Sequence, residues 1–148
     1  MYKNDSVAEI QISYNTTIRN KVRITTVKSA YDIFLASWSI KTIELYEDFK
    51  LLLLNRANNV IGIYHLSKGG VTGTVVDTKL IFAVALKCNA TGIILCHNHP
   101  SGNLHPSEPD KNITQQIKKA ASLFDINLLD HLIISKDEYF SFSENALI

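Results

Sequence analysis

The sequence predicts a single α/β domain built from a mixed β-sheet flanked by helices on both faces. Short apolar runs of strand character alternate with amphipathic segments of helical period, which indicates both kinds of element. Some successive strands are separated only by a turn and others by a helix, so antiparallel and parallel neighbours are both expected. A length of 148 residues fits one domain with a substantial core.

Composition narrows the class of protein. Hydrophobic residues are 46% and charged residues 20% of the chain, as in ordinary globular proteins. The net charge of +1 gives no strong field to attract nucleic acid or an anionic membrane, which counts against DNA binding as the main activity. Two cysteines, Cys88 and Cys96, exclude a disulfide scaffold and favour a reducing, cytoplasmic setting. We expect no secretory leader and no membrane span, since no apolar run approaches ~20 residues.

Residues 1–25 are predicted to form an N-terminal extension with a pair of strands, ahead of the main domain over 26–148. Residues 8–14 alternate strictly between apolar and polar side chains, which is typical of a half-buried strand. Residues 21–24 are interpreted as the return strand after a turn.

The main domain is predicted to open with a helix. Ser29 should begin it, with Asp32 three residues later as a capping partner. Its apolar side chains recur at helical spacing and should lie in the core: Ala30, Ile33, Phe34 and Trp38. Residues 42–46 are expected to form a second short helix or a loop.

A strand hairpin and a second helix follow. Residues 50–54 are apolar on both faces, which predicts a central strand. Turn residues at 56–59 lead to the partner strand over 60–66. Asp77 should then cap a helix. One face of that helix is apolar: Leu80, Ile81, Val84, Ala85 and Cys88.

The last part of the chain is predicted to form a strand, a long helix and two further strands. Residues 92–96 are short, apolar and β-branched, as in a buried strand. A helix is predicted from about Ser107 to Phe124, followed by a strand over 127–134 and a short edge strand over 139–142. The buried stripe of this helix should comprise Ile113, Ile117, Ala120, Ala121 and Phe124.

Three candidate metal ligands lie between the strand over 92–96 and the helix that follows it. Side chains i and i+2 of an extended chain point to the same side, so His97 and His99 can aim both imidazoles at one point. Asp110 can return to that point because the intervening loop has the residues of a tight reversal. Two imidazoles and one carboxylate suit Zn²⁺, and three protein ligands leave a fourth position open, as a catalytic metal requires.

Ser107 and Asp110 also fit a purely structural role. They have the spacing of a capping box at a helix start, and Pro109 is tolerated within the first turn. The two roles are compatible, because capping uses backbone N–H groups and leaves carboxylate oxygen free for a metal.

The run HNHPSGNLHPSEPD at 97–110 resembles the metal motif of the JAB/MPN (JAMM) metalloprotease superfamily, His-x-His-Pro followed by Ser-x-x-Asp. The fuller set, HNHPSG…PS..D…T with LLDHLIIS and YFSF downstream, is similar to the RadC-like branch of that superfamily and covers about 26–148. The resemblance implies an MPN-type fold related to cytidine deaminases. It also implies a zinc ion held by His97, His99 and Asp110 that activates water against an amide bond.

The resemblance implies roles for two more residues. JAMM enzymes carry a general-base glutamate near the start of the first central strand, and RadC-like members show Glu-x-Phe there. The matching residue is Glu47, with Asp48 and Glu44 as alternatives. Ser107 matches the family serine that helps to hold the oxyanion. Alternatively Ser107 only caps the helix, a contribution of about 1 kcal/mol to stability.

Other polar residues have competing interpretations. Asp130 and His131 interrupt an apolar strand, either to orient a zinc-bound imidazole or as a polar pair at a strand edge. His105 could be a fourth ligand, but an ordinary loop histidine is expected, and His65 should be structural. Cys96 alternates away from the histidines and should be a buried small hydrophobe rather than a nucleophile.

The expected function is therefore a zinc-dependent hydrolase of peptidase or isopeptidase type, acting on a polypeptide or isopeptide substrate. Two alternatives belong to other classes. RadC-like proteins are traditionally linked to DNA repair, so a DNA-repair or mobile-element accessory role is one, although only about 25 residues precede the matching region, too few for a helix-hairpin-helix module. A catalytically silent MPN scaffold is the other, and the intact set of His97, His99, Asp110 and Ser107 argues against it.

Overall fold

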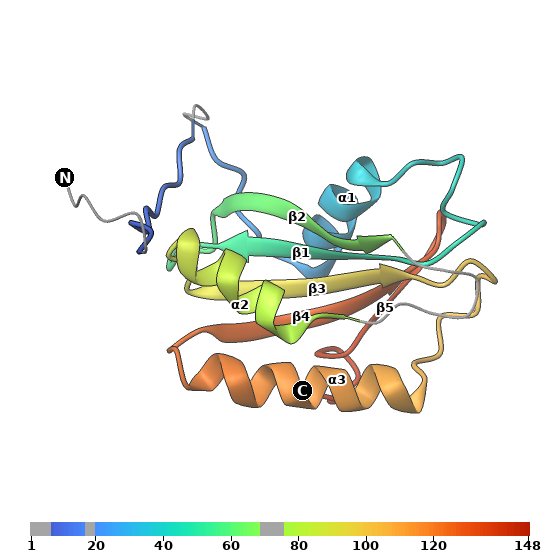
Figure 1. Ribbon diagram of the computed structural model, residues 1–148. Helices are drawn as coiled ribbons and strands as arrows, with labels where there is room; N and C mark the ends of the chain where they lie inside the picture. Colours follow the sequence, from blue (N-terminus) through green and yellow to red (C-terminus); the bar gives the residue numbers. More distant parts are fainter. Residues whose placement is uncertain (1–6, 17–19, 69–75) are drawn as a thin grey trace.

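A five-stranded mixed sheet forms the centre of the protein (Figure 1). The computed structural model describes residues 7–16, 20–68 and 76–148. The elements in these ranges are α1 (Val27–Ser37), β1 (Asp48–Leu54), β2 (Val60–Lys68), α2 (Thr78–Lys87), β3 (Gly92–Asn98), α3 (Glu108–Ser122), β4 (Asn127–Ile134) and β5 (Tyr139–Ser141). The strand order is β2-β1-β3-β4-β5, with β3 and β4 parallel and the other pairs antiparallel. The predicted α/β class and mixed sheet are confirmed.

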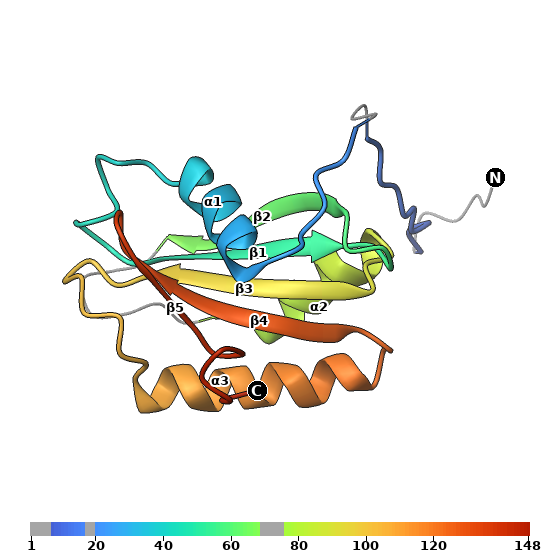
Figure 2. The ribbon, with the colours of Figure 1, turned by 180° about the vertical axis from the view of Figure 1, so that it is seen from behind.

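Helices cover both faces of the sheet: α1 lies on one face, and α2 and α3 lie on the other (Figures 1 and 2). Side chains of β1 alternate between these faces, as the pleat of a strand requires. Phe49, Leu51 and Leu53 join the core beneath α2 and α3, whereas Leu52 and Leu54 pack against α1. All seven β1 positions are buried, which confirms the predicted central strand.

A buried lysine fixes the end of α1 against the sheet. Lys50 is only 7% exposed, and its ammonium donates to the carbonyl oxygen and hydroxyl of Ser37, at 2.6 and 3.1 Å. The same nitrogen lies 4.3 Å from the ring centroid of Trp38. A cation at the C-terminal end of a helix is favourable, because the last carbonyl groups carry partial negative charge. Lys50 therefore ties α1 to β1.

Helix α1 begins earlier than the sequence predicted. Thr26, not Ser29, is the N-cap: its hydroxyl accepts from the Ser29 N–H, and the Ser29 hydroxyl accepts from the Thr26 N–H. Both residues carry a hydroxyl that can cap a helix, so their side chains alone did not distinguish them. Asp32 instead pairs with Lys28 at 2.8 Å. Residues 42–46 form turns and a bend.

The predicted N-terminal strand pair is wrong. Residues 8–14 contain no strand and are exposed; Ile10, for example, is 87% exposed. In the predicted return strand over 21–24, the structure has only one isolated bridge, from Arg23 to Asn59. Alternating side chains form a strand only where a neighbouring strand and an apolar surface receive them. Among the described residues no strand pairs with 8–14, although the Tyr14 hydroxyl donates to the Ile61 carbonyl on β2 at 3.2 Å.

The second and third helices agree with the sequence. Asp77 caps α2 by accepting from the N–H groups of Lys79 and Leu80. Ser107 caps α3, which then runs from Glu108 to Ser122. The exception is Phe124, which was predicted to lie in the buried stripe but follows the end of α3 and is 47% exposed.

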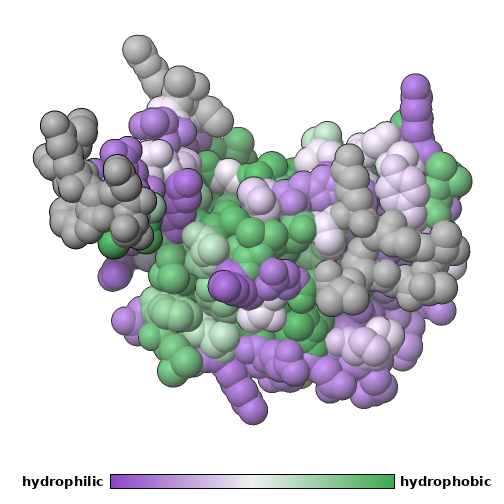
Figure 3. Space-filling view, in the orientation of Figure 1, coloured by the Kyte–Doolittle hydropathy of each residue, from purple (hydrophilic) through white to green (hydrophobic). Residues whose placement is uncertain are grey.

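Hydrophobic surface gathers over α2 and the C-terminal end of α3 (Figure 3). Leu86 of α2 is 51% exposed, and Leu123 and Phe124 after α3 are also exposed. Among the helices in the described ranges, none is long and apolar enough to cross a membrane.

Candidate metal centre

The connection from β3 to α3 brings the candidate ligands to one end of the sheet, at the right of Figure 1. His97 is the penultimate residue of β3, and His99 follows the strand directly. Gly102 has a φ of 80°, a conformation that favours glycine, and its N–H donates to the His99 carbonyl at 2.9 Å. The chain then reaches Ser107, which caps α3, and Asp110 in the first helical turn. Because β3-α3-β4 is a parallel crossover, the end of β3 and the start of α3 are neighbours.

The side chains of His97, His99 and Asp110 converge on one point. The two histidine Nε2 atoms are 3.0 Å apart. Asp110 Oδ1 lies 3.3 Å from Nε2 of His97, and Asp110 Oδ2 lies 3.5 Å from Nε2 of His99. The His97 side chain is 1% exposed, whereas those of His99 and Asp110 are 16% and 17% exposed. One side of the cluster therefore lies in the buried core, and the other side is exposed to solvent.

A hydrogen-bond relay sets the tautomer of His97. The Thr114 hydroxyl donates to the Asp110 carbonyl at 2.6 Å, so its oxygen can accept from Nδ1 of His131, also at 2.6 Å. Burial, followed by the neighbouring His97, holds the pKa of His131 well below its usual range, so this imidazole is neutral and its Nε2 carries a lone pair. Nε2 of His131 accepts from Nδ1 of His97 at 2.8 Å. We therefore assign the ring proton of His97 to Nδ1, which leaves a lone pair on Nε2.

The same reasoning applies to His99. Its Nδ1 lies 2.6 Å from the carbonyl oxygen of Asn103, and a carbonyl can only accept, so Nδ1 carries the proton. The neutral forms of His97 and His99 thus direct Nε2 lone pairs at each other, beside the Asp110 carboxylate. Three electron-rich groups at this separation repel one another unless a cation lies between them. This donor set is what a metal site needs.

The spacing of the donors fits zinc. In a tetrahedral site with ligand bonds of about 2.0–2.1 Å, neighbouring ligand atoms are roughly 3.3 Å apart. The two Nε2 atoms are 3.0 Å apart, and each faces a different oxygen of Asp110: Oδ1 lies 3.3 Å from His97 and Oδ2 lies 3.5 Å from His99. Two imidazoles and a carboxylate also match the ligand types that zinc takes in catalytic sites, where one position is left for water.

The electrostatics of the cluster agree with this picture. Burial raises the pKa of Asp110, but contacts with His97 and His99 and the Ser107 N–H outweigh it and leave that pKa far below the usual range. Burial lowers the pKa of His99, but Asp110 and the Asn103 carbonyl outweigh it and raise the pKa above the ordinary value. The site therefore holds a full negative charge and attracts a positive one, whether a proton or a metal ion.

Glu47 reaches the same cluster from the position just before β1. The antiparallel register pairs Phe49 with His97, which brings residue 47 opposite His99. Glu47 Oε1 lies 3.8 Å from Nε2 of His99, and the donor atoms of Glu47, His97 and His99 all lie within 4.8 Å of one another. The ring of Phe49 stacks on the ring of His97, with 5.4 Å between the two centroids, and so covers the side of the His97 ring that faces the core. Glu47 and Asp110 thus both bring a carboxylate to the two histidines, and Glu47, His97 and His99 by themselves form a group that could hold a metal ion.

The other two candidate bases lie elsewhere. Asp48 is 5% exposed and has an oxygen 3.7 Å from Nε2 of His65. Glu44 pairs at the surface with Lys136 at 3.0 Å. Of the three carboxylates that the sequence offered, the structure brings Glu47 to the histidines.

Comparison with known proteins gives the family. A family model described as the RadC-like JAB domain matches residues 24–147, which is most of the chain. The chain belongs to the RadC-like JAB domain family. The resemblance inferred from the sequence motif is confirmed.

Individual relatives agree with this assignment. A UPF0758 protein of Flavobacterium johnsoniae is 41% identical over 141 residues, which are 95% of this chain and 62% of that protein. A UPF0758 protein of Clostridium beijerinckii is 36% identical over 146 residues, 97% of this chain and 62% of that protein. A UPF0758 protein of Porphyromonas gingivalis is 47% identical over 103 residues, 69% of this chain and 45% of that protein. The chain thus spans 62% or less of the length of these curated relatives.

Ser107 of this RadC-like JAB domain forms the predicted capping box. Its hydroxyl accepts from the Asp110 N–H at 3.2 Å, and its own N–H donates to Asp110 Oδ2 at 2.8 Å. The second contact orients the carboxylate whose other oxygen faces His97. Ser107 itself is exposed.

The structure separates the predicted pair Asp130 and His131. His131 contacts His97 in the relay, whereas Asp130 points to the α1 face of the sheet. There its carboxylate accepts from the hydroxyl of Ser141 at 2.6 Å and from the N–H groups of Ser143 and His131 at 3.0 and 2.7 Å. The hydrogen bonds of the Asp130 carboxylate are therefore with the chain around β5 and with the backbone of His131, and none of these is with an imidazole ring.

The remaining sequence candidates lie outside the cluster. His105 is exposed in the loop, and His65 lies on β2 beside Asp48. Cys96 is fully buried, and burial raises the pKa of its thiol well above the usual range, as expected for a small core residue. Sequence reasoning gave no role to Thr114, although it lies four residues after Asp110 and therefore on the same side of α3.

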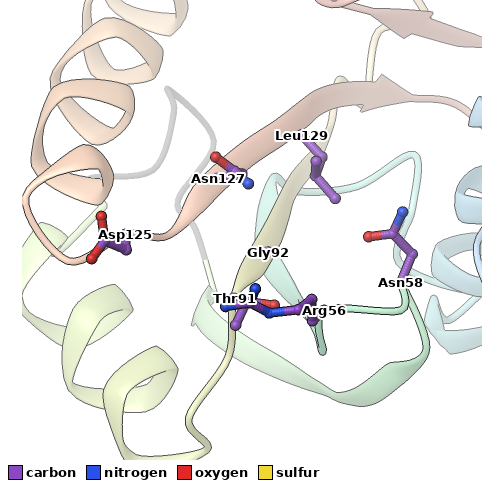
Figure 4. Close-up of a pocket in the computed structure, with 7 residues that line it drawn as sticks. All are labelled: Arg56, Asn58, Thr91, Gly92, Asp125, Asn127 and Leu129. Carbon is purple, nitrogen blue, oxygen red and sulfur yellow. The ribbon is translucent and has the colours of Figure 1, made fainter.

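A separate recess lies at the opposite end of the sheet (Figure 4). It has a volume of about 230 Å³ and is formed around Gly92, at the start of β3, with Arg56, Asn58 and Asn127 on its walls. Its polar groups come from turns after β1 and α3, and the histidine cluster lies beyond the far end of β3. The recess is therefore not part of the metal centre.

Proposed function

We propose that this RadC-like JAB domain is a zinc-dependent hydrolase of amide bonds, of peptidase or isopeptidase type. The observation that carries the proposal is the convergence of two imidazole lone pairs and one carboxylate, with a second carboxylate 3.8 Å away. Three ligands with a further carboxylate beside them are the arrangement of a hydrolytic metal site rather than a structural one. His97, His99 and Asp110 would hold the ion.

Each residue then has one task. When bound, zinc would lower the pKa of water at the site to roughly 7. Glu47 would take a proton from the attacking water at its carboxylate and later donate it to the nitrogen of the departing amine. Ser107 donates its hydroxyl to the substrate oxygen that gains negative charge when the amide carbonyl is attacked. His131 and Thr114 keep the ligand tautomer of His97 in place.

Metal analysis of the purified protein, followed by three variants, tests these roles. We expect one zinc per chain in the wild type and loss of tight binding in His97→Ala and Asp110→Ala. Glu47→Gln should keep the metal and lose cleavage of a peptide library read by mass spectrometry, by roughly 100-fold or more. His105→Ala is the control, because this exposed histidine lies outside the cluster.

Zinc that is lost in Glu47→Gln but kept in Asp110→Ala would contradict the assignment of roles. The silent-scaffold alternative predicts zinc binding without cleavage in both the wild type and Glu47→Gln. Cleavage of the library peptides that persists after zinc is removed would contradict the metal mechanism itself.

A further inference from the structure

We propose that Asn98 is the positioning residue of the catalytic carboxylate. This side chain lies between the two ligand histidines in sequence, and it holds both peptide groups that flank Glu47. The inference deepens the proposed function and rests on it, because it concerns the base of the same reaction.

Asn98 is completely buried and makes three hydrogen bonds to one segment of backbone. Its Oδ1 accepts from the N–H of Asp48 at 2.7 Å. Its Nδ2 donates to the carbonyl of Tyr46 at 3.0 Å and to the carbonyl of Ile43 at 2.7 Å. The amide thus bridges the end of the turn before β1 and the first residue of that strand.

These contacts bracket a single residue. The Tyr46 carbonyl belongs to the peptide unit before the Cα of Glu47, and the Asp48 N–H belongs to the unit after it. Peptide units are planar, so fixing one on each side of a Cα fixes both φ and ψ at that residue. The direction in which the Glu47 side chain leaves the backbone is then set by Asn98.

Strand alternation makes one tripeptide responsible for both halves of the site. His97 and His99 face the metal position, and Asn98 faces the opposite side, toward the segment that carries the base. The task requires one acceptor and two donors in a short side chain, which only asparagine offers. Aspartate lacks the donors when ionised, and glutamine is longer by one methylene. The geometry therefore couples the placement of ligands and base.

The test compares Asn98→Ala and the isosteric Asn98→Asp with Cys96→Ala. Cys96 is buried on the same face of β3 and packs in the α1 core, which also includes Ile43, so its truncation loosens that core while the three hydrogen bonds of Asn98 remain. The probe is acetohydroxamate, a zinc chelator whose proton passes to the neighbouring carboxylate, and its binding to the zinc-loaded protein is measured by calorimetry. The loss of acetohydroxamate affinity in Glu47→Gln is the reference with which the losses in the Asn98 variants are compared.

We expect both Asn98 variants to bind zinc as the wild type does but to bind acetohydroxamate roughly tenfold more weakly or worse. Cys96→Ala should bind it as the wild type does. Adding Asn98→Ala to Glu47→Gln should cause no further loss, because both changes remove the same interaction. Wild-type binding in zinc-loaded Asn98→Asp and Asn98→Ala, or an equal loss in Cys96→Ala, would overturn the inference.

Amide hydrogen exchange gives a readout that is independent of the metal. Exchange over residues 43–48 should accelerate in the Asn98 variants and stay unchanged in Cys96→Ala. Unchanged exchange in the Asn98 variants overturns the positioning role even where no zinc is bound. A wild type that fails to take up zinc would instead overturn the proposed function, so the two failures are distinguishable.

Discussion

The lone pair that His97 presents to a metal depends on a hydroxyl two contacts away. Thr114 accepts from His131, and His131 accepts from His97, so the orientation of one proton is passed along three side chains. Thr114 also donates to the carbonyl of Asp110, which links the relay to a second ligand. A change at Thr114 therefore acts on two candidate ligands at once, His97 and Asp110, although this residue is not itself a candidate ligand.

Thr114→Val keeps the shape of the side chain but removes the hydroxyl. Nδ1 of His131 then loses its acceptor and the Asp110 carbonyl loses its donor, so the relay no longer selects one tautomer. We expect zinc affinity to fall by about 10–100-fold. Thr114→Ser should restore most of it, and competition with a chromogenic chelator measures both. Equal affinities in the valine variant and the wild type would contradict the relay.

Zinc binding should weaken as the pH falls. The pKa of His99 is raised, and a proton on its Nε2 occupies the lone pair that zinc would use. Affinity is therefore high above that pKa and declines below it, while Asp110, whose pKa is lowered, stays ionised throughout. Affinities measured between about pH 5 and pH 8 check this. A zinc affinity that stays constant over that range would show that protons do not compete with zinc for His99.

At the scale of elements, two helices begin with the same device and only one of them borders the site. Thr26 caps α1 and Ser107 caps α3, each in a reciprocal capping box. This gives a matched pair of variants with which to separate stability from chemistry at Ser107.

Thr26→Ala and Ser107→Ala should each lower the free energy of unfolding by about 1 kcal/mol. Both variants should retain zinc, because the Ser107 N–H that holds Asp110 is a backbone group. Cleavage should fall further in Ser107→Ala than in Thr26→Ala, although the two variants lose the same stability. Urea denaturation and the peptide-library assay make the comparison. Equal cleavage by the two variants would leave Ser107 with the capping role alone.

Most elements could be predicted from local pattern, and the errors have local causes. Residues 50–54 and 92–96 are apolar on both faces, and only a strand covered by helices buries such a run. The alternation at 8–14 carries less information, because a half-buried strand needs a partner that the sequence does not specify. The start of α1 was misplaced because two hydroxyl residues, Thr26 and Ser29, both suit a cap.

For the molecule as a whole, the convergence of His97, His99 and Asp110 could be predicted because they lie within one stretch of fourteen residues, and spacing along a strand and a helix start fixes their geometry. The partners from other elements could be predicted only in part: the family resemblance gave Glu47, and His131 was one member of a pair with two competing interpretations. Leu128 and Leu132 would share a face in a regular strand, yet they pack in opposite cores, because the register of β4 shifts between Leu128 and Asp130. That shift turns His131 toward the metal position and Asp130 away from it. The sequence offers no sign of it.

Zinc should stabilise the entire domain, since the ligands come from both β3 and α3 and converge only in the folded state. At a free zinc concentration of 100 times Kd, the gain is about 2.7 kcal/mol, and for a domain of this size each kcal/mol raises Tm by roughly 2–4 °C. Calorimetry with zinc and with a chelator measures the difference. His97→Ala should show almost none, and an equal shift in that variant would place the ion elsewhere.

The pairing of Phe49 with His97 has a consequence for how the chain reaches its final form. A slip of one position between those neighbours would rotate His97 into the α1 core and present Asn98 in its place. A collapsed but misaligned chain would then lack both the paired imidazoles and the clamp on the loop before β1. The time course of zinc uptake during refolding would therefore report when β1 and β3 reach their correct register.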